Sequence, residues 1–263
     1  MKKLSGIKKI IILALVIISG YLFCIWQNNS IVITETEYTN AKIPDAFNDY
    51  VICQISDLHN KEFGENQRNI LNKISRISPD IIVITGDIVD RRKYNLEVAM
   101  EFVKGAIDIA PIYYVSGNHE AWSNQYTSIK NSLVNEGVVV LDDTMSQITI
   151  NESSIDIVGV SDPDFLTSKY SEGTDISYME QQLKQWSENQ NFTILLSHRP
   201  ELFHMYVENN MDLVFSGHAH GGQIRLPFVG GLVAPDQGVF PKYTSGQHKE
   251  EDTTMFVSRG LGN

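Results

Sequence analysis

A short apolar run that ends in polar residues recurs five times along this chain, and this repetition restricts the fold more than any other feature. Several runs are followed by a helical pattern, such as residues 66–77, whose isoleucines and leucine share one face. The runs are apolar almost throughout, which is typical of strands buried on both sides. We therefore expect an α/β fold in which helices cover the sheet faces. The runs and the polar segments after them are VICQI–SDLHN, IIVIT–GDIVD, IYYVS–GNHE, FTILLS–HRPE and DLVFS–GHAHGG.

Two further helices and several more strands are predicted from the same patterns. The helices cover about residues 96–109 and 125–135, and Pro111 and Gly137 follow them as stop signals. Residues 31–39, with the sequence IVITETEYT, alternate apolar and polar side chains, so we expect an edge strand there. Additional strands are expected at VVVL, SQITI, IDIVGV and TMFVS.

The N-terminal segment combines four lysines with an uncharged apolar stretch at residues 10–26, close to the lower length limit for a membrane-spanning helix. We expect a cytoplasmic basic tail at residues 1–9, a transmembrane anchor at 10–26, a lead-in and linker at 27–49, and one folded domain at 50–263. The lysines precede the apolar stretch, which places the domain outside the cytoplasm. A cleaved signal peptide is the alternative, but residues 23–26, FCIW, form a poor cleavage site.

The chain is acidic, with a formal net charge of −11, and its domain is more acidic still because four lysines precede the apolar stretch. This charge argues against binding of long nucleic acids, which requires a basic surface. A small phosphate ester remains compatible, because bound metal ions can dominate the local charge of a site. Only Cys24 and Cys53 are present, which excludes a disulfide framework and a thiolate metal site.

The polar segments after the apolar runs share the same few side-chain types. Carboxylate, amide oxygen and imidazole are the usual ligands of divalent transition metals. The carboxyl ends of strands in an open α/β sheet face one crevice, so residues distant in sequence can converge there. One such histidine alone would indicate a core or capping residue, and an aspartate alone a helix cap, but capping does not explain their joint recurrence. The candidates are Asp57, His59, Asp87, Asn118, His119, His198, His218 and His220.

The ordered segments SDLH, GDIVD, GNHE, SHRPE and GHAHGGQ resemble the motifs of the calcineurin-like metallophosphoesterase superfamily. The resemblance covers about residue 31 to the end. It is strongest to the membrane-associated bacterial branch, similar to the YkuE and YaeI phosphodiesterases. It implies a two-sheet sandwich flanked by helices. It also implies two metal ions (manganese, iron or zinc), and hydrolysis of a phosphodiester or pyrophosphate bond by attack of a metal-bound hydroxide.

The resemblance also implies a role for each candidate. One metal ion would be held by Asp57, His59 and His220, and the other by Asn118, His198 and His218. Asp87 would bridge the two ions. His119 would be the catalytic general acid for the leaving oxygen, or a hydrogen-bond donor to the phosphoryl group.

Three details of the sequence leave alternatives open. Glu120 stands where the family more often has aspartate, and its longer side chain could still orient His119. Arg199 could bind the substrate phosphate, or it could pair with Glu201 or another acid. Relatives usually continue beyond SRGLGN, so we expect that the domain lacks its last strand and is less stable for it.

The substrate is also open. A lipid- or nucleotide-linked ester would suit an enzyme anchored at a membrane. A phosphomonoesterase or protein phosphatase of the same fold is the main alternative. A non-catalytic binding module is disfavoured, because the seven predicted ligands and His119 are all present.

Overall fold

The computed structural model describes residues 6–167, 174–226 and 230–262, and the chain divides into two units, Met1–Tyr38 and Thr39–Asn263. The first unit contains helix α1 (Gly6–Asn29), which has 24 residues, a mean hydropathy of 2.4 and no buried side chain. By length and composition α1 is able to cross a membrane, a property that signal sequences share. It extends beyond the predicted segment 10–26 at both ends, while residues 1–5 of the predicted basic tail lie outside the described part.

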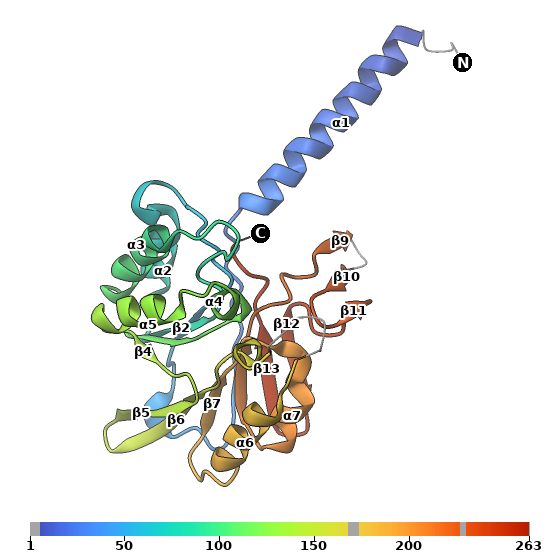
Figure 1. Cartoon of the computed structure of the whole chain (residues 1–263). Coiled ribbons are helices and arrows are strands. Elements are labelled where there is room, and N and C mark those ends of the chain that lie inside the picture. Colours follow the sequence, from blue (N-terminus) through green and yellow to red (C-terminus); the bar gives the residue numbers. More distant parts are fainter. Residues whose placement is uncertain (1–5, 168–173, 227–229, 263) are drawn as a thin grey trace. The chain divides into compact units, whose positions relative to one another are not determined.

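Three sheets form the framework of the second unit (Figure 1). The first sheet is parallel, in the order β1-β2-β3-β4. The second has the order β12-β13-β8-β7-β6-β5, and its inner strands β13, β8, β7 and β6 are parallel. The third is small and antiparallel, in the order β11-β10-β9.

The strand bounds follow the predicted apolar runs closely. In the first sheet they are β1 (Ile52–Ile55), β2 (Ile81–Thr85), β3 (Ile112–Val115) and β4 (Val139–Val140). In the second they are β5 (Thr144–Ile150), β6 (Ser153–Gly159), β7 (Thr193–Leu196), β8 (Leu213–Ser216), β12 (Gly246–Glu250) and β13 (Thr253–Val257). The third contains β9 (Ile224–Leu226), β10 (Gly230–Ala234) and β11 (Gly238–Val239).

Helices cover the two larger sheets from opposite sides (Figure 1). The group beside the first sheet is α2 (Arg68–Ile77), α3 (Leu96–Ile107) and α5 (Tyr126–Asn135), and the group beside the second is α6 (Ser177–Trp186) and α7 (Phe203–Glu208). A short helix, α4 (Asn118–Trp122), begins at the GNHE segment. Short 3-10 turns are η1 (Asp45–Phe47), η2 (Glu65–Gln67), η3 (Pro163–Phe165) and η5 (Pro200–Leu202).

The apolar runs form the core because they are covered on both faces. Every residue of β2, β3, β7 and β8 is buried. Side chains of α6 and α7, such as Leu183 and Phe203, pack with Val214 of β8 on the outer face of the six-stranded sheet. The Gln54 amide of β1 donates hydrogen bonds to Thr85 Oγ1 at 3.2 Å and to the carbonyl of Ser216 at 2.9 Å, which joins the two large sheets. The predicted two-sheet sandwich flanked by helices is confirmed.

The predicted edge strand at residues 31–39 is wrong. Residues 30–40 have no regular secondary structure, because the described part of the chain supplies no strand that pairs with them. Alternation alone specifies a strand only where a sheet edge accepts it.

The end of the described chain packs on the β1 turn. The backbone N–H of Leu261 donates to the carbonyl of Ser56 at 3.1 Å, and that of Gly262 donates to the carbonyl of Asp57. Strand β13 is paired on both sides, with β12 and β8. Whether the domain lacks a further strand stays a prediction.

Replacement of Gly159 by alanine tests the closeness of the two large sheets. A methyl group there would lie 2.5 Å from the carbonyl oxygen of Leu141 and from Cγ1 of Val115 in β3. We expect the substitution to cost about 1–3 kcal/mol, because overpacking forces the backbone to shift. The thermal midpoint of the full-length protein in detergent should fall by several degrees. The control is Gly20→Ala, because a Cβ atom at Gly20 in α1 would have nothing within 4 Å, so its thermal midpoint should equal that of the wild type. A wild-type midpoint for Gly159→Ala would contradict the close packing of the two large sheets at this position.

Candidate metal centre

The predicted site residues lie at the carboxyl ends of five parallel strands. Asp57 and His59 follow β1, Asp87 follows β2, and Asn118 and His119 begin α4 after β3. His198 follows β7, and His218 and His220 follow β8. The strands of the two sheets therefore deliver their polar ends to one region, as expected for an α/β arrangement.

Four of these side chains form a first donor group: Asp57, His59, Asp87 and His220. The Nε2 atoms of His59 and His220 are 3.2 Å apart, and His220 Nε2 is 3.3 Å from Asp57 Oδ1. His59 Nε2 is 3.7 Å from Asp87 Oδ2. Two imidazole nitrogens and two carboxylates thus face a common point.

A second donor group is formed by Asp87, His198 and His218. His198 Nε2 lies 3.3 Å from Asp87 Oδ2 and 3.2 Å from His218 Nδ1. It also lies 3.1 Å from Asn118 Oδ1, which brings the predicted amide ligand to the same place. Asp87 belongs to both groups, so its carboxylate lies between them.

The donor set fits two divalent cations. Donors about 2.0–2.2 Å from one ion in tetrahedral or octahedral geometry lie about 3.0–3.5 Å from each other, and most spacings above fall in this range. The carboxylates of Asp57 and Asp87 are at most 1% exposed. Buried carboxylates are costly unless positive charge neutralises them. The two groups hold nitrogen and oxygen donors, which suit manganese, iron and zinc alike.

His198 is oriented for ligation by a hydrogen bond from its other ring nitrogen. Its Nδ1 lies 2.7 Å from the carbonyl of Thr85, so Nδ1 carries the proton and Nε2 is left facing Asp87 and Asn118. Burial disfavours the charged ring, but the carboxylates of Asp87, Asp57 and Asp162 together outweigh burial and raise the pKa of His198 to about 10. A cation takes over the role of that proton, because histidine ligates in its neutral form.

The ligand turns have an unusual backbone. Five of the predicted ligands have positive φ angles, between 48° and 63°, although none of them is glycine: Asp57, His59, Asp87, His218 and His220. Such conformations are uncommon for residues with a Cβ atom and concentrate at functional sites. Gly117 lets the turns approach closely, because a Cβ atom there would lie 2.3 Å from Asp87 Oδ1.

Among the described contacts, the Glu120 side chain forms no hydrogen bond to His119, so the structure does not support the suggestion that it orients the histidine. Its carboxylate is buried and accepts hydrogen bonds from the backbone N–H groups of Asp87 (2.7 Å), Gly117 (2.8 Å) and Val89 (3.2 Å). Burial and then repulsion by Asp87 raise the pKa of Glu120 to about 8, against the effect of these bonds. Glu120 thus fixes the turn that presents Asp87.

His119 packs against the first donor group with its ring close to that of His59, at a centroid distance of 4.3 Å. Its Nδ1 accepts a hydrogen bond from the backbone N–H of Arg91 at 3.2 Å and lies 3.7 Å from Asp90 Oδ1. Burial lowers the pKa of His119 to about 4, so the ring is neutral near pH 7. Because Nδ1 accepts, the proton of the neutral ring is on Nε2.

Arg199 is enclosed by carboxylates and is only 1% exposed. Its Nε and Nη2 donate to the two oxygens of Asp162 at 2.7 and 2.8 Å, and Nη2 also lies 2.7 Å from Asp164. Its Nη1 is 2.6 Å from Asp236 and 3.6 Å from Glu201. These contacts support pairing with acids, the alternative to substrate binding.

The sequence patterns did not single out Asp90, Asp162 or Asp236 as site residues. Of the three, Asp90 could most easily have been predicted from the sequence, since it lies in the same GDIVD segment as Asp87. Asp162 and Asp236 lie in loops that carry no ligand pattern, so only their approach to Arg199 reveals them.

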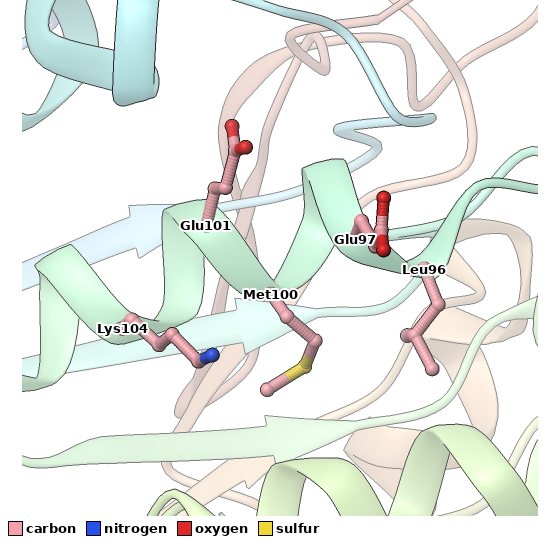
Figure 2. Close-up of a pocket in the computed structure, with 5 residues that line it drawn as sticks. All are labelled: Leu96, Glu97, Met100, Glu101 and Lys104. Carbon is pink, nitrogen blue, oxygen red and sulfur yellow. The ribbon is translucent and has the colours of Figure 1, made fainter.

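A separate surface depression lies along α3. Figure 2 shows that its lining side chains all project from this one helix: Leu96, Glu97, Met100, Glu101 and Lys104. None of them belongs to the donor groups. A depression with no convergent polar groups from different elements is a surface feature of the helix and not a second reaction centre.

Replacement of Arg199 by alanine should strongly destabilise the fold. The substitution leaves Asp162 and Asp164 buried without their cation, and removal of one partner of a buried ion pair costs about 3–5 kcal/mol. Urea unfolding of the metal-free, full-length protein measures the change in the free energy of unfolding. Arg92→Ala, at an exposed position, should change it by less than about 0.5 kcal/mol. Equal values for the two variants would show that the carboxylates do not depend on Arg199.

Comparisons with known proteins agree with this geometry. A model of the calcineurin-like phosphoesterase family matches residues 50–222. The protein named as uncharacterized metallophosphoesterase YkuE of Bacillus subtilis is 31% identical over 238 residues, which cover 88% of this chain and 79% of YkuE. UDP-2,3-diacylglucosamine pyrophosphatase LpxG of Chlamydia trachomatis is 28% identical over 279 residues, covering 80% of this chain and 77% of LpxG.

A solved structure shows the same fold. The crystal structure of the protein TT1561 of Thermus thermophilus matches with a TM-score of 0.53 at 15% identity, over 81% of this chain and 90% of that one. The family match and the clustered metal-binding residues identify a phosphoester hydrolase. The chain belongs to the calcineurin-like phosphoesterase family.

Proposed function

We propose that this chain hydrolyses a phosphodiester or pyrophosphate bond at a site that holds two metal ions. The observation that carries the proposal is the position of Asp87, whose carboxylate belongs to both donor groups. A shared carboxylate suits a pair of ions about 3.5–4 Å apart, the separation found in two-metal phosphoesterases.

Each predicted ligand has a place in this proposal. Asp57, His59 and His220 would hold the first ion, Asn118, His198 and His218 would hold the second, and Asp87 would be shared by both. When bound, the ions lower the pKa of an attacking water and neutralise charge on the phosphate oxygens. Ser56 donates to Asp57 Oδ2 at 2.6 Å, and the backbone N–H of His218 lies 3.2 Å from both Asp57 oxygens, so this ligand is held before any ion arrives.

His119 is the catalytic side chain that meets the substrate in this proposal. With Nδ1 occupied by the Arg91 N–H, the ring offers its Nε2 proton as a hydrogen-bond donor. This geometry favours donation to the phosphoryl group over proton transfer to the leaving oxygen. Hydrogen bonds of this type act by stabilising charge that develops in the transition state.

The substrate class is proposed from chemistry and likeness together. LpxG, one relative, is named as a pyrophosphatase of UDP-2,3-diacylglucosamine, a substrate that is both lipid- and nucleotide-linked. We therefore place a lipid- or nucleotide-linked diester or pyrophosphate first. A phosphomonoesterase or protein phosphatase is the second candidate, since the same donor set serves both.

The proposed location of the enzyme rests on the N-terminal segment. Helix α1 includes the predicted transmembrane anchor at residues 10–26 and is apolar enough to cross a bilayer. Lysines precede the apolar stretch, so we propose a cytoplasmic N-terminus and an extracytoplasmic catalytic domain at residues 50–263. A membrane position brings the site close to lipid headgroups.

The Asp87→Asn variant should lose both metal ions and nearly all activity. Loss of the shared negative charge weakens metal binding by both donor groups. Without the metal ions the enzyme loses several kcal/mol of transition-state stabilisation, which corresponds to at least about a 1,000-fold loss in rate. The test measures bound metal and the hydrolysis of bis(p-nitrophenyl) phosphate with added manganese, with exposed Asp252→Asn as control. Unchanged hydrolysis by Asp87→Asn would exclude the proposed site.

The same assay separates the candidate functions. Faster hydrolysis of bis(p-nitrophenyl) phosphate than of p-nitrophenyl phosphate supports a phosphodiesterase, and the reverse supports a phosphomonoesterase. Bound metal with no hydrolysis of either reporter would indicate a narrow substrate range.

The His119→Asn variant should retain its metal ions and lose about 10²–10³-fold in kcat, the usual effect of removing one transition-state hydrogen bond. The test compares aryl phosphodiesters with p-nitrophenol and phenol as leaving groups. We expect similar losses for both, because the proton of the neutral ring is donated to the phosphoryl group. A much larger loss with phenol would instead identify His119 as the general acid. His204→Asn, on the surface, should leave all rates unchanged.

A further inference from the structure

Asp236 brings a carboxylate from the small third sheet to the second donor group. It lies in the turn between β10 and β11. Its Oδ2 is 2.8 Å from His218 Nε2 and 2.6 Å from Arg199 Nη1. His218 thus has Nδ1 toward His198, at 3.2 Å, and Nε2 toward Asp236 and, at 3.3 Å, toward Arg199 Nη1. The two ring nitrogens of one predicted ligand face different partners.

The contact with Asp236 decides which nitrogen of His218 carries the proton. An ionised carboxylate only accepts hydrogen bonds, so the contact of 2.8 Å with Asp236 favours the proton on Nε2. Arg199 Nη1 also lies near Nε2, but at the longer distance of 3.3 Å, and it donates to Asp236 at 2.6 Å. The lone pair is then on Nδ1, the atom that faces His198 and Asp87. Without the carboxylate, the ring is free to adopt the other tautomer, in which a proton on Nδ1 would point at the cation position.

Arg199 holds Asp236 in place. Its guanidinium is anchored by both oxygens of Asp162 and by Asp164, so its position does not depend on the third sheet. The remaining nitrogen, Nη1, reaches the same Asp236 oxygen that binds His218. Arginine stays charged at all working pH values, so Arg199 is a permanent positive partner of the Asp236 carboxylate.

A third cation between Glu201, His218 and Asp236 is a competing interpretation, because their donor atoms cluster. Arg199 Nη1 already lies 2.6 Å from Asp236 and 3.6 Å from Glu201. The guanidinium supplies the positive charge that such an ion would bring. The cluster is therefore a support for His218 and not a further metal site.

We propose that Asp236 is a positioning residue for the second metal ion, acting through His218 and clamped by Arg199. The inference rests on the proposed two-metal function. Carboxylates that accept the distal proton of a histidine ligand fix its tautomer and strengthen its basicity, and their loss typically weakens metal binding by about 10–100-fold. The first ion, held by Asp57, His59 and His220, has no contact with Asp236 and should be unaffected.

The test uses the metal-free, full-length protein, titrated with Mn²⁺ alone. Calorimetry measures the two dissociation constants, and electron paramagnetic resonance measures the fraction of Mn²⁺ in spin-coupled pairs. For Asp236→Ala we expect one of the two dissociation constants to rise by about 10–100-fold, with a matching loss of the coupled signal, while the other dissociation constant stays unchanged. Asp236→Asn, which keeps an acceptor oxygen without the charge, should give an intermediate rise.

Glu201→Gln is the matched control, because Glu201 contacts the same Arg199 nitrogen and forms no hydrogen bond to His218 among the described contacts. Both of its dissociation constants should equal those of the wild type. The thermal midpoint of metal-free Asp236→Ala should also stay near the wild-type value, since the Asp236 side chain is 35% exposed.

Three outcomes would overturn the proposal in distinguishable ways. Two unchanged dissociation constants in Asp236→Ala would remove its positioning role and leave the proposed function intact. Equal weakening of both sites, with a lower thermal midpoint, would give Asp236 a general structural role. Fewer than two Mn²⁺ ions on the wild-type protein would contradict the proposed two-metal function itself.

Discussion

The burial of two carboxylates at strand ends is the constraint on which this structure depends. Asp57 and Asp87 are almost inaccessible to solvent, and burial of such charges is costly unless positive charge compensates them. Four histidines, Asn118 and a fixed set of backbone N–H groups surround them. Positive φ angles at five ligands and a glycine with no room for a Cβ atom show that the turns are shaped for this convergence.

A second buried charge cluster supports the first. Arg199 compensates Asp162 and Asp164 and extends to Asp236, which binds the distal nitrogen of His218. Glu120 acts in a similar way on the other side, where its carboxylate holds the backbone of the Asp87 turn. The ligands are thus positioned by the ion pairs and hydrogen bonds around them as well as by the strands that carry them.

The sequence predicted the strands of the core and the ligands at their ends because both depend on local patterns. A buried apolar run such as residues 81–85 predicts a strand without information from the rest of the chain. The position of Asp87 is then predicted as well, because Asp87 follows shortly after the end of that strand. The edge strand at residues 31–39 was wrongly predicted, because alternation needs a partner strand that the pattern cannot supply. The hydrogen bonds of Glu120 were not predicted for a related reason: its sequence neighbour is His119, but its hydrogen-bond partners include the distant Asp87 and Val89.

By itself, the sequence determined which side chains are available for metal chemistry, their order, and the α/β class that gathers them, since each of these follows from short segments and their periodicity. Only the tertiary structure decided how the donors divide into two groups with Asp87 in both, that Arg199 is enclosed by acids, and that Asp236 reaches His218. These contacts join residues from different strands and loops. Their distances are set by the packing of the two large sheets and of the small third sheet, which no local pattern encodes.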